Sequence, residues 1–398
     1  MAGDFTCWYS KLKIKKSKIK LINILINCPM NMSIYINENK ITKLSIIGSV
    51  GLPANYGGWE SLIENIINFI SKDLEISVFC SSKIYKNKIP KYKNVKLIYI
   101  NLYPNGFQSI FYDLFSMIYA IRKSNLMLLL GVSGCIFLPL IKIFYKGKII
   151  VNTDGLDSER LKWGFFARTF LRLSEVFAVR FADCIVTDNH GISKYIFKKY
   201  GRKTVQIAYG GDHAKKIKLS LKVKKNYNIP NIYAFKVARI EPENNIEMLL
   251  NCFSKTGFPL VIVGNWKSSQ YGRDLIQKFK KISNIKILDA IYDLKILNQI
   301  RSNAFIYVHG HSVGGTNPSL VEAMASGLPI FAYDVNFNRY TTDNSCLYFK
   351  NKKELNSLIL NINKNVISKI GIKMKQIANQ KYKWSKIGQQ YLNLFQNL

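Results

Sequence analysis

Acidic residues and histidines are scarce in this chain. Its 398 residues include 24 Asp and Glu against 58 Lys and Arg, and only four histidines, so the formal net charge is +34. A chain so poor in carboxylates is not an acidic, solvating protein, and polyanions such as nucleic acid, anionic lipid or phosphorylated substrates are its expected partners. Lysine, asparagine and isoleucine are abundant along the whole chain, so a general drift in composition explains the basicity equally well.

The chain also lacks paired cysteines. Its seven cysteines are scattered singly with no C-x-x-C pair, which excludes a zinc ribbon and a disulfide framework and indicates reduced thiols in a cytoplasmic protein. Long apolar runs are missing too. Residues 126–141 form the best candidate for a membrane span, but the run is only about 16 residues and contains two glycines and a proline, so we expect a buried strand that turns into a helix.

The first 42 residues do not resemble a cleaved signal sequence. Six lysines between positions 11 and 20 precede an apolar run of only residues 21–26, and no small-residue cleavage site follows. We therefore interpret residues 1–42 as a basic extension.

From residue 43 onward, short β-branched runs alternate with longer amphipathic ones, which is typical of parallel sheets with crossover helices. The first series of predicted strands covers residues 44–48, 76–80, 95–100, 126–131, 149–152, 183–187 and 205–209, and a helix is predicted over 59–70. The second series covers 233–238, 260–264, 285–288, 304–309 and 329–333. We predict an α/β protein with Rossmann-like domains at 43–212 and 213–380, a linker near 212–230, and a final helix within 381–398 that packs back on the first domain.

The motif that indicates chemistry most clearly is HGHSVGGTNPSLVEAMASGLP at 309–329, a strand end that passes through a glycine-rich turn into a helix. Pro318 suits the first helical turn, and Gly327 suits its end. Backbone N–H groups and a helix N-terminus at such a turn can hold a diphosphate. Glu322 lies one turn into the helix, where a carboxylate can accept hydrogen bonds from ribose hydroxyls.

Four motifs together resemble the retaining GT-B glycosyltransferases of family 4, closest to a bacterial rhamnosyltransferase-like subgroup with a DUF1972-type N-terminal domain. They are GSVGLPANYGGWE at 48–60, NTDGLD at 152–157, VARIEPENN at 237–245 and the glycine-rich motif at 309–329. The likeness spans roughly residues 43–396, and it implies two Rossmann-like domains facing across a cleft. It also implies sugar transfer from a nucleotide-sugar, with donor-binding residues Arg239, Gly314, Gly315, Thr316, Asn317 and Glu322.

Two positions depart from the family pattern. The first glutamate of the family's E-x7-E motif is replaced by Gly314, so backbone amides of 314–316 and the side chains of Thr316 and Asn317 are expected to handle the sugar. The lysine that usually follows Arg239 is replaced around Asn244. This leaves Arg239 and the helix terminus as the main groups that neutralise phosphate charge.

The resemblance places the acceptor side in the first domain. The loop at 48–60 is expected to line the acceptor and touch the diphosphate through Gly51, Asn55, Tyr56, Gly57 and Gly58. Its glycine spacing is not G-x-G-x-x-G, which disfavours a nicotinamide dinucleotide. Asp154 is the catalytic candidate, since a carboxylate there could orient the acceptor hydroxyl or stabilise positive charge at the sugar; a simple turn residue before Gly155 is the alternative.

No cofactor is expected. His309 and His311 flank the glycine-rich turn without a third ligand at a suitable spacing, and His190 and His213 are isolated, so no metal site is predicted. The resemblance also implies metal-independent transfer.

Basic and aromatic residues alternate at 160–180. Such a segment can rest on anionic headgroups, or it can be a core helix with solvated arginines, and the sequence favours neither. The residues are Arg160, Lys162, Arg168, Arg172 and Arg180 with Trp163, Phe165, Phe166, Phe170 and Phe177. By resemblance, the acceptor is a polyprenyl-diphosphate-linked saccharide for surface polysaccharide, the donor is dTDP-rhamnose, and the enzyme lies at the inner face of the cell membrane.

Two other functions remain open at this point. A nucleotide-sugar epimerase of GT-B shape would turn over the donor without an acceptor. A non-catalytic polyanion-binding protein would bind nucleic acid with a steep salt dependence. The chain has no aromatic RNA-binding signature, so no specific nucleic-acid partner is predicted.

Overall fold

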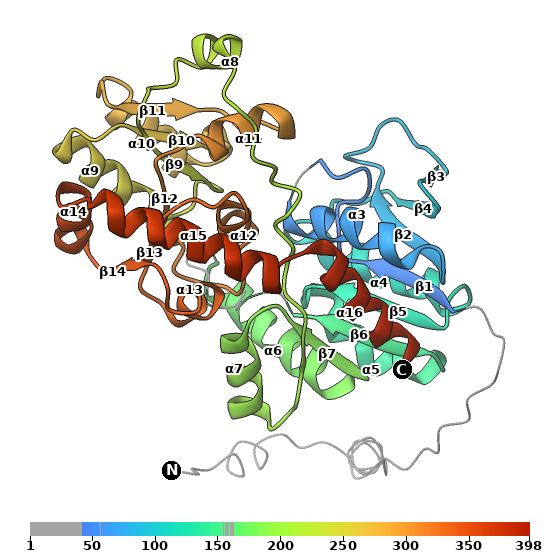
Figure 1. Ribbon diagram of the computed structural model, residues 1–398. Helices are drawn as coiled ribbons and strands as arrows, with labels where there is room; N and C mark the ends of the chain where they lie inside the picture. The colour runs from blue at the N-terminus through green and yellow to red at the C-terminus, as the bar shows by residue number, and fades with distance from the viewer. Residues whose placement is uncertain (1–41, 56, 154, 156–158, 160–162) are drawn as a thin grey trace. The chain divides into compact units, whose positions relative to one another are not determined.

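The protein is built on two separate sheets, and nearly all of their strands are parallel (Figure 1). The computed structural model describes residues 42–398 except 56, 154, 156–158 and 160–162. The predicted site residues Tyr56 and Asp154 therefore lie outside the described residues, as does nearly all of the predicted extension at 1–42. The predicted α/β class with two Rossmann-like domains is confirmed. We call the part built on the eight-stranded sheet the first domain and the part built on the six-stranded sheet the second domain.

The first sheet has the strand order β3-β4-β2-β1-β5-β6-β7-β8, and every pair except β3 with β4 is parallel. Buried aliphatic residues fill its central strands, as parallel strands covered on both faces require. The strand predicted over 205–209 is shorter than expected, because only two exposed residues pair at this sheet edge. The strands are β1 (Lys43–Ile47), β2 (Glu75–Ser81), β3 (Lys91–Tyr92), β4 (Val95–Ile100), β5 (Leu126–Leu130), β6 (Lys148–Asn152), β7 (Cys184–Thr187) and β8 (Val205–Gln206).

Helices cover both faces of the first sheet. Helix α3 (Gly58–Ile70) contributes to the hydrophobic cluster on one face. A second cluster on the other face is formed with α4 (Gln108–Ile121), α5 (Leu138–Phe144), α6 (Phe165–Phe181) and α7 (His190–Tyr200). The apolar run at 126–141 is strand β5 followed by a 3-10 turn, η1 (Ser133–Phe137), and the start of α5, as predicted. Within the described part of the chain, no helix has the length and apolar character needed to cross a bilayer.

The second sheet has the order β11-β10-β9-β12-β13-β14, all parallel. Its strands are β9 (Ala234–Val237), β10 (Leu260–Val263), β11 (Ile285–Leu288), β12 (Ile306–His309), β13 (Ile330–Tyr333) and β14 (Leu347–Phe349), the last not predicted. Its helices and turns are η3 (Pro242–Asn244), α9 (Ile246–Thr256), η4 (Trp266–Ser268), α10 (Gln270–Phe279), α11 (Leu294–Ser302), α12 (Pro318–Ala325), α13 (Asn336–Thr341), α14 (Lys352–Leu360) and α15 (Lys364–Lys381).

Two segments join the domains. The stretch predicted as a linker contains a short helix, α8 (Leu221–Asn226), whose preceding residue Ser220 donates its N–H to Gln299 of α11. The last helix, α16 (Trp384–Gln396), lies against α3: a side chain at Gly388 would come within 2.6 Å of the Phe69 ring. Asn152 at the end of β6 donates a hydrogen bond to the Tyr391 hydroxyl at 2.8 Å. Helix α16 thus returns the chain from the second domain to the first.

Candidate active site

The predicted donor residues gather at the carboxyl ends of β9 and β12. These central strands are parallel neighbours in the second sheet, so the residues that follow them lie side by side at the carboxyl ends of the strands. Arg239 follows β9 with its side chain 54% exposed, and its Nε lies 3.6 Å from Glu241 Oε2. The glycine-rich loop follows β12 and leads into α12, which carries Glu322.

The loop after β12 is fastened to the turn after β9. Asn245 donates to the Gly310 carbonyl at 2.7 Å, and the Ser312 N–H donates to the Glu243 carbonyl at 2.9 Å. Asn244, near the position where the resemblance would place a lysine, donates its amide N–H to the Arg239 carbonyl at 2.9 Å. The two segments are therefore one rigid unit, and Asn244 has a structural place in it.

The same bonds fix the orientation of His311. Its Nδ1 lies 2.7 Å from the Asn244 side-chain oxygen. Because the Asn244 amide nitrogen already donates to a carbonyl, this oxygen is the acceptor and Nδ1 carries the hydrogen. Nε2 then faces the glycine-rich loop, 2.8 Å from where a side chain would begin at Gly314, whose φ is +133°. A glutamate at 314 would not fit here, and sequence reasoning missed that an imidazole occupies its place.

Three loops of the first domain approach the glycine-rich loop. A side chain at Gly155 would come within 2.6 Å of Gly314 Cα, and one at Gly58 would touch the Pro318 ring. Asp188, the residue after β7, accepts the Thr316 N–H on Oδ2 at 3.0 Å, and its backbone carbonyl accepts the Thr316 hydroxyl at 2.7 Å. The tertiary structure thus brings Gly58, Gly155, Gly314 and Thr316 together.

Asp188 corrects one expectation about the loop. The Thr316 N–H and hydroxyl, predicted to be open to a donor, are taken up by Asp188, and Thr316 is buried. A side chain at Gly315 would lie 1.8 Å from Asp188 Oδ1, so only glycine permits the approach. A carboxylate therefore lies where the sequence predicts the diphosphate. The position of Asp188 just after a parallel strand was the signal that could have identified it.

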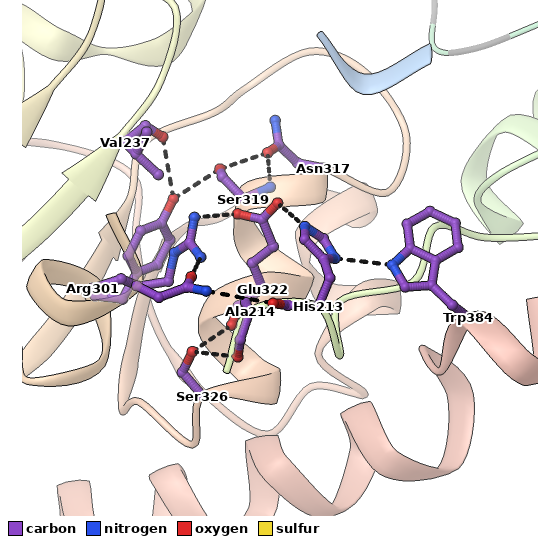
Figure 2. A network of polar contacts seen from close by, with 11 residues as sticks. His213, Ala214, Val237, Arg301, Asn317, Ser319, Glu322, Ser326 and Trp384 are labelled. Carbon is purple, nitrogen blue, oxygen red and sulfur yellow. Dashed lines mark hydrogen bonds and ion pairs between the residues drawn. The ribbon is translucent and has the colours of Figure 1, made fainter. Parts of the chain in front are cut away.

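Asn317 also has a structural role. Its side-chain oxygen accepts the Ser319 N–H at 3.0 Å and the Ser319 hydroxyl at 2.7 Å, which caps the N-terminus of α12. Its amide nitrogen points away from this network (Figure 2). Of this side chain, only the amide nitrogen is left for the predicted contact with the sugar.

Glu322 is held by two partners at once (Figure 2). Its Oε2 accepts from Arg301 Nη2 at 2.5 Å, and its Oε1 lies 3.0 Å from His213 Nε2. Burial alone would raise the pKa of Glu322, but the Arg301 charge and the His213 hydrogen bond lower it below its usual value. The side chain is 14% exposed, and each carboxylate oxygen can accept more than one bond. Glu322 is thus a preorganised, ionised acceptor.

His213, isolated in the sequence, is not isolated in the fold. The Trp384 indole N–H donates to His213 Nδ1 at 2.9 Å. An indole can only donate, so Nδ1 is an acceptor, and the neutral ring carries its hydrogen on Nε2 toward Glu322. His213 lies where the chain passes from the first domain to the second, and Trp384 where it returns. Glu322 is therefore linked to both crossings.

The glycine-rich loop of the first domain is shaped by two carboxylates of α3. Glu60 accepts the Val50 N–H at 2.7 Å, and burial raises its pKa. Glu64 accepts the Ala54 N–H at 3.1 Å. Gly51 has φ +130° and packs against Cys80, so its glycine is required by the fold. Among the predicted contacts, Asn55 is exposed, and Gly57 and Gly58 stand at the start of α3.

A buried lysine was not predicted. Lys236 in β9 is fully buried, and among the described residues no acceptor lies within hydrogen-bonding distance of its Nζ. Burial lowers its pKa to about 7. Burial also holds the pKa of His309 well below its usual value, with the Lys236 charge adding to the effect. The described residues include no group of three or more His, Cys, Asp or Glu placed to hold a metal ion.

Residues 218–384 match the family "Glycosyl transferases group 1", and residues 41–212 match "Domain of unknown function (DUF1972)". With the two-sheet fold, these matches support a glycosyltransferase of the GT-B fold class. Comparison of the sequence with curated proteins returned no match.

Three solved structures illustrate the likeness. Sucrose-phosphate synthase of Thermosynechococcus elongatus has a TM-score of 0.75 at 15% identity, over 89% of this chain and 98% of its own. Anabaena HepE, solved with UDP-glucose, has a TM-score of 0.69 at 16% identity, over 90% of this chain and 100% of its own. The N-terminal domain of Candida albicans trehalose-6-phosphate phosphatase has a TM-score of 0.63 at 11% identity, over 91% and 99%. At these identities the likeness shows the fold.

Proposed function

We propose that this chain is a retaining glycosyltransferase that moves a sugar from a nucleoside diphosphate to a polyprenyl-diphosphate-linked saccharide during surface polysaccharide synthesis. The observation that carries the proposal is the convergence of Arg239, the 314–316 loop and Glu322 at one edge of the second sheet, with first-domain loops opposite. These groups match two parts of a nucleotide-sugar: cationic and amide donors suit the diphosphate, and a carboxylate suits the ribose.

In this proposal the second domain holds the donor. Arg239, half exposed, grips the diphosphate, and Glu322 accepts from the ribose hydroxyls. His311 Nε2 lies beside Gly314, so the imidazole takes the place of the missing glutamate next to the sugar or its phosphate. HepE, of the same fold, was solved with UDP-glucose; a deoxysugar donor such as dTDP-rhamnose agrees with the lost carboxylate at 314.

Asp188 explains how the loop is kept in place before the donor arrives. Its Oδ2 accepts the Thr316 N–H, as a phosphate oxygen would. We infer that the diphosphate takes over the Thr316 N–H and displaces this carboxylate. Binding of the donor would then loosen one contact between the domains and make new ones.

The transfer itself needs no protein nucleophile. The acceptor hydroxyl attacks the anomeric carbon on the face that the diphosphate leaves, the bond from that carbon to the phosphate oxygen breaks, and the departing phosphate takes the hydroxyl proton. The protein's share is to position both substrates and to neutralise the growing negative charge. Asp154, outside the described residues, remains our candidate for orienting the acceptor. No metal or cofactor is required in this scheme.

A donor screen tests the proposal. Thermal shift with a panel that includes UDP-glucose and dTDP-rhamnose should reveal a donor, and mass spectrometry should then find the transferred sugar when membrane extract supplies the acceptor. Donor turnover without an acceptor would indicate an epimerase. If no nucleotide-sugar shifts the melting temperature or is consumed, while nucleic acid binds with a steep salt dependence, the proposal fails.

A further inference from the structure

Three first-domain helices, α4, α5 and α6, expose many apolar side chains on their outer surface. On α4 the exposed large side chains are Phe111, Phe115, Ile118 and Tyr119, and Phe107 precedes the helix with 76% exposure. The positions 107, 111, 115 and 118 recur at helical spacing, so they form one stripe opposite the buried face of α4. Apolar side chains on the outward stripe are the reverse of what a solvated helix shows.

The neighbouring helices repeat this pattern. On α5 every exposed position is apolar: Leu140, Ile143 and Phe144. On α6 the exposed positions include Phe165 at 77% and Phe166 at 87%, and then Leu173 and Val176. Helix α5 contacts both α4 and α6. These helices lie on the same face of the first sheet, since all of them contribute to its second hydrophobic cluster (Figure 1). We call this surface of α4, α5 and α6 the apolar face.

The charges around the apolar face are mainly positive, with exposed Glu159 paired to Arg172 at 3.3 Å as an exception. Among the described residues of α4, α5, α6 and α7, no exposed position is acidic. Asp113 and Glu175 are buried, and the exposed charges are Arg172, Arg180, Lys194, Lys198 and Lys199. Arg122 and Lys123 follow α4 directly and are exposed too. Aromatic and aliphatic side chains flanked mainly by basic ones are the pattern of surfaces that bind an anionic lipid interface.

We infer that the apolar face docks the protein on an anionic lipid bilayer. This inference rests on the proposed function, because a lipid-linked acceptor must be met at a membrane surface. The charges argue against a second copy as the occupant, since pairing this face with itself would bring its arginines and lysines together. Several hundred Å² of contiguous exposed apolar surface on a monomer marks an interaction site in general; its basic margin selects the lipid.

The test compares two triple variants of the full chain. One replaces exposed residues of the apolar face, Phe144→Ser, Phe165→Ser and Phe166→Ser. The matched control replaces exposed aliphatic residues elsewhere, Leu221→Ser, Leu360→Ser and Ile372→Ser, which are 85%, 68% and 60% exposed. Binding is measured by co-sedimentation with vesicles of phosphatidylcholine, with and without phosphatidylglycerol, at rising salt.

We expect the wild-type protein and the control to bind vesicles that contain phosphatidylglycerol, and binding to weaken with salt. The apolar-face variant should lose affinity by at least about tenfold per phenylalanine. The inference is overturned if this variant binds like the control or if the wild-type protein does not bind anionic vesicles. It is also overturned if light scattering shows that the wild-type protein and the control are dimers and the apolar-face variant is a monomer.

A second measurement separates this inference from the proposed function. Calorimetric titration with UDP and dTDP, without vesicles, should give the same affinity for wild-type protein and for both variants. Nucleotide binding without vesicle binding would overturn the docking surface and leave the glycosyltransferase standing. Vesicle binding without any nucleotide binding would support the docking surface and overturn the glycosyltransferase.

Discussion

Replacing Asp188 by asparagine tests whether this carboxylate stands in for the donor diphosphate. Asparagine keeps the shape and can still accept the Thr316 N–H, which lies 3.0 Å from Asp188 Oδ2, but it removes the charge. A charge-assisted hydrogen bond contributes about 1 kcal/mol more than a neutral one. We therefore expect D188N to lower the free energy of unfolding by about 1 kcal/mol, measured by urea denaturation.

The same change should strengthen donor binding. If the diphosphate must displace Asp188 from Thr316, the weaker neutral bond is easier to displace, and about 1 kcal/mol corresponds to roughly fivefold tighter binding. Isothermal titration with UDP and dTDP measures this. The signature is a protein that is less stable yet binds nucleotide better.

Asp183→Asn is the matched control for D188N. Asp183 also lies beside β7, accepts the Ile149 N–H at 2.7 Å and pairs with Lys142, but it touches no residue of the 314–316 loop. Its variant should lose stability with no change in nucleotide affinity. If D188N weakens nucleotide binding, Asp188 contacts the donor and does not compete with it. If its affinity is unchanged, the loop does not bind the diphosphate through Thr316.

Three further substitutions address single groups. Glu322→Gln leaves the Arg301 charge buried without its counterion, so we expect the free energy of unfolding to fall by about 3 kcal/mol, measured by urea denaturation. Because the folded pKa of Glu322 is lowered, its contribution to stability is present above its unfolded pKa and is lost as pH falls through the folded pKa. The stability of the variant should therefore depend less on pH in acid. Arg239→Ala should weaken nucleotide binding roughly 30-fold, from about 2 kcal/mol for a charged contact, and leave stability unchanged because the side chain is half exposed. Lys236 has a folded pKa of about 7 against 10.5 in the unfolded chain, so the stability of the wild-type protein should rise with pH between these values. Lys236→Met should abolish this rise and stabilise the protein at pH 7 by on the order of a few kcal/mol. A flat wild-type profile across that window would contradict the burial argument for Lys236.

The hydrophobic pattern alone determined the strands and the sheet class. The run at 260–264 and the alternation of apolar segments with helical ones are local signals, since a strand buried on both faces must be apolar along its length. The glycine-rich motif likewise marked its own strand, turn and helix, because Pro318 and Gly327 act through their backbone angles. What escaped were short edge strands such as β14, because three residues, although apolar, are too few to show a strand pattern.

Only the tertiary structure decided which groups fill the site. Asp188 and Thr316 are 128 residues apart, and His213 and Trp384 are 171 apart, yet each pair is joined by a hydrogen bond. No local pattern encodes such pairs, because a hydrogen bond between distant segments depends on how the chain crosses between the sheets. The same holds for His311, which faces Gly314 only because Asn244 orients it. The sequence by itself determined a loop whose backbone can bind an anion. The fold decided that the Asp188 carboxylate of the first domain binds that loop.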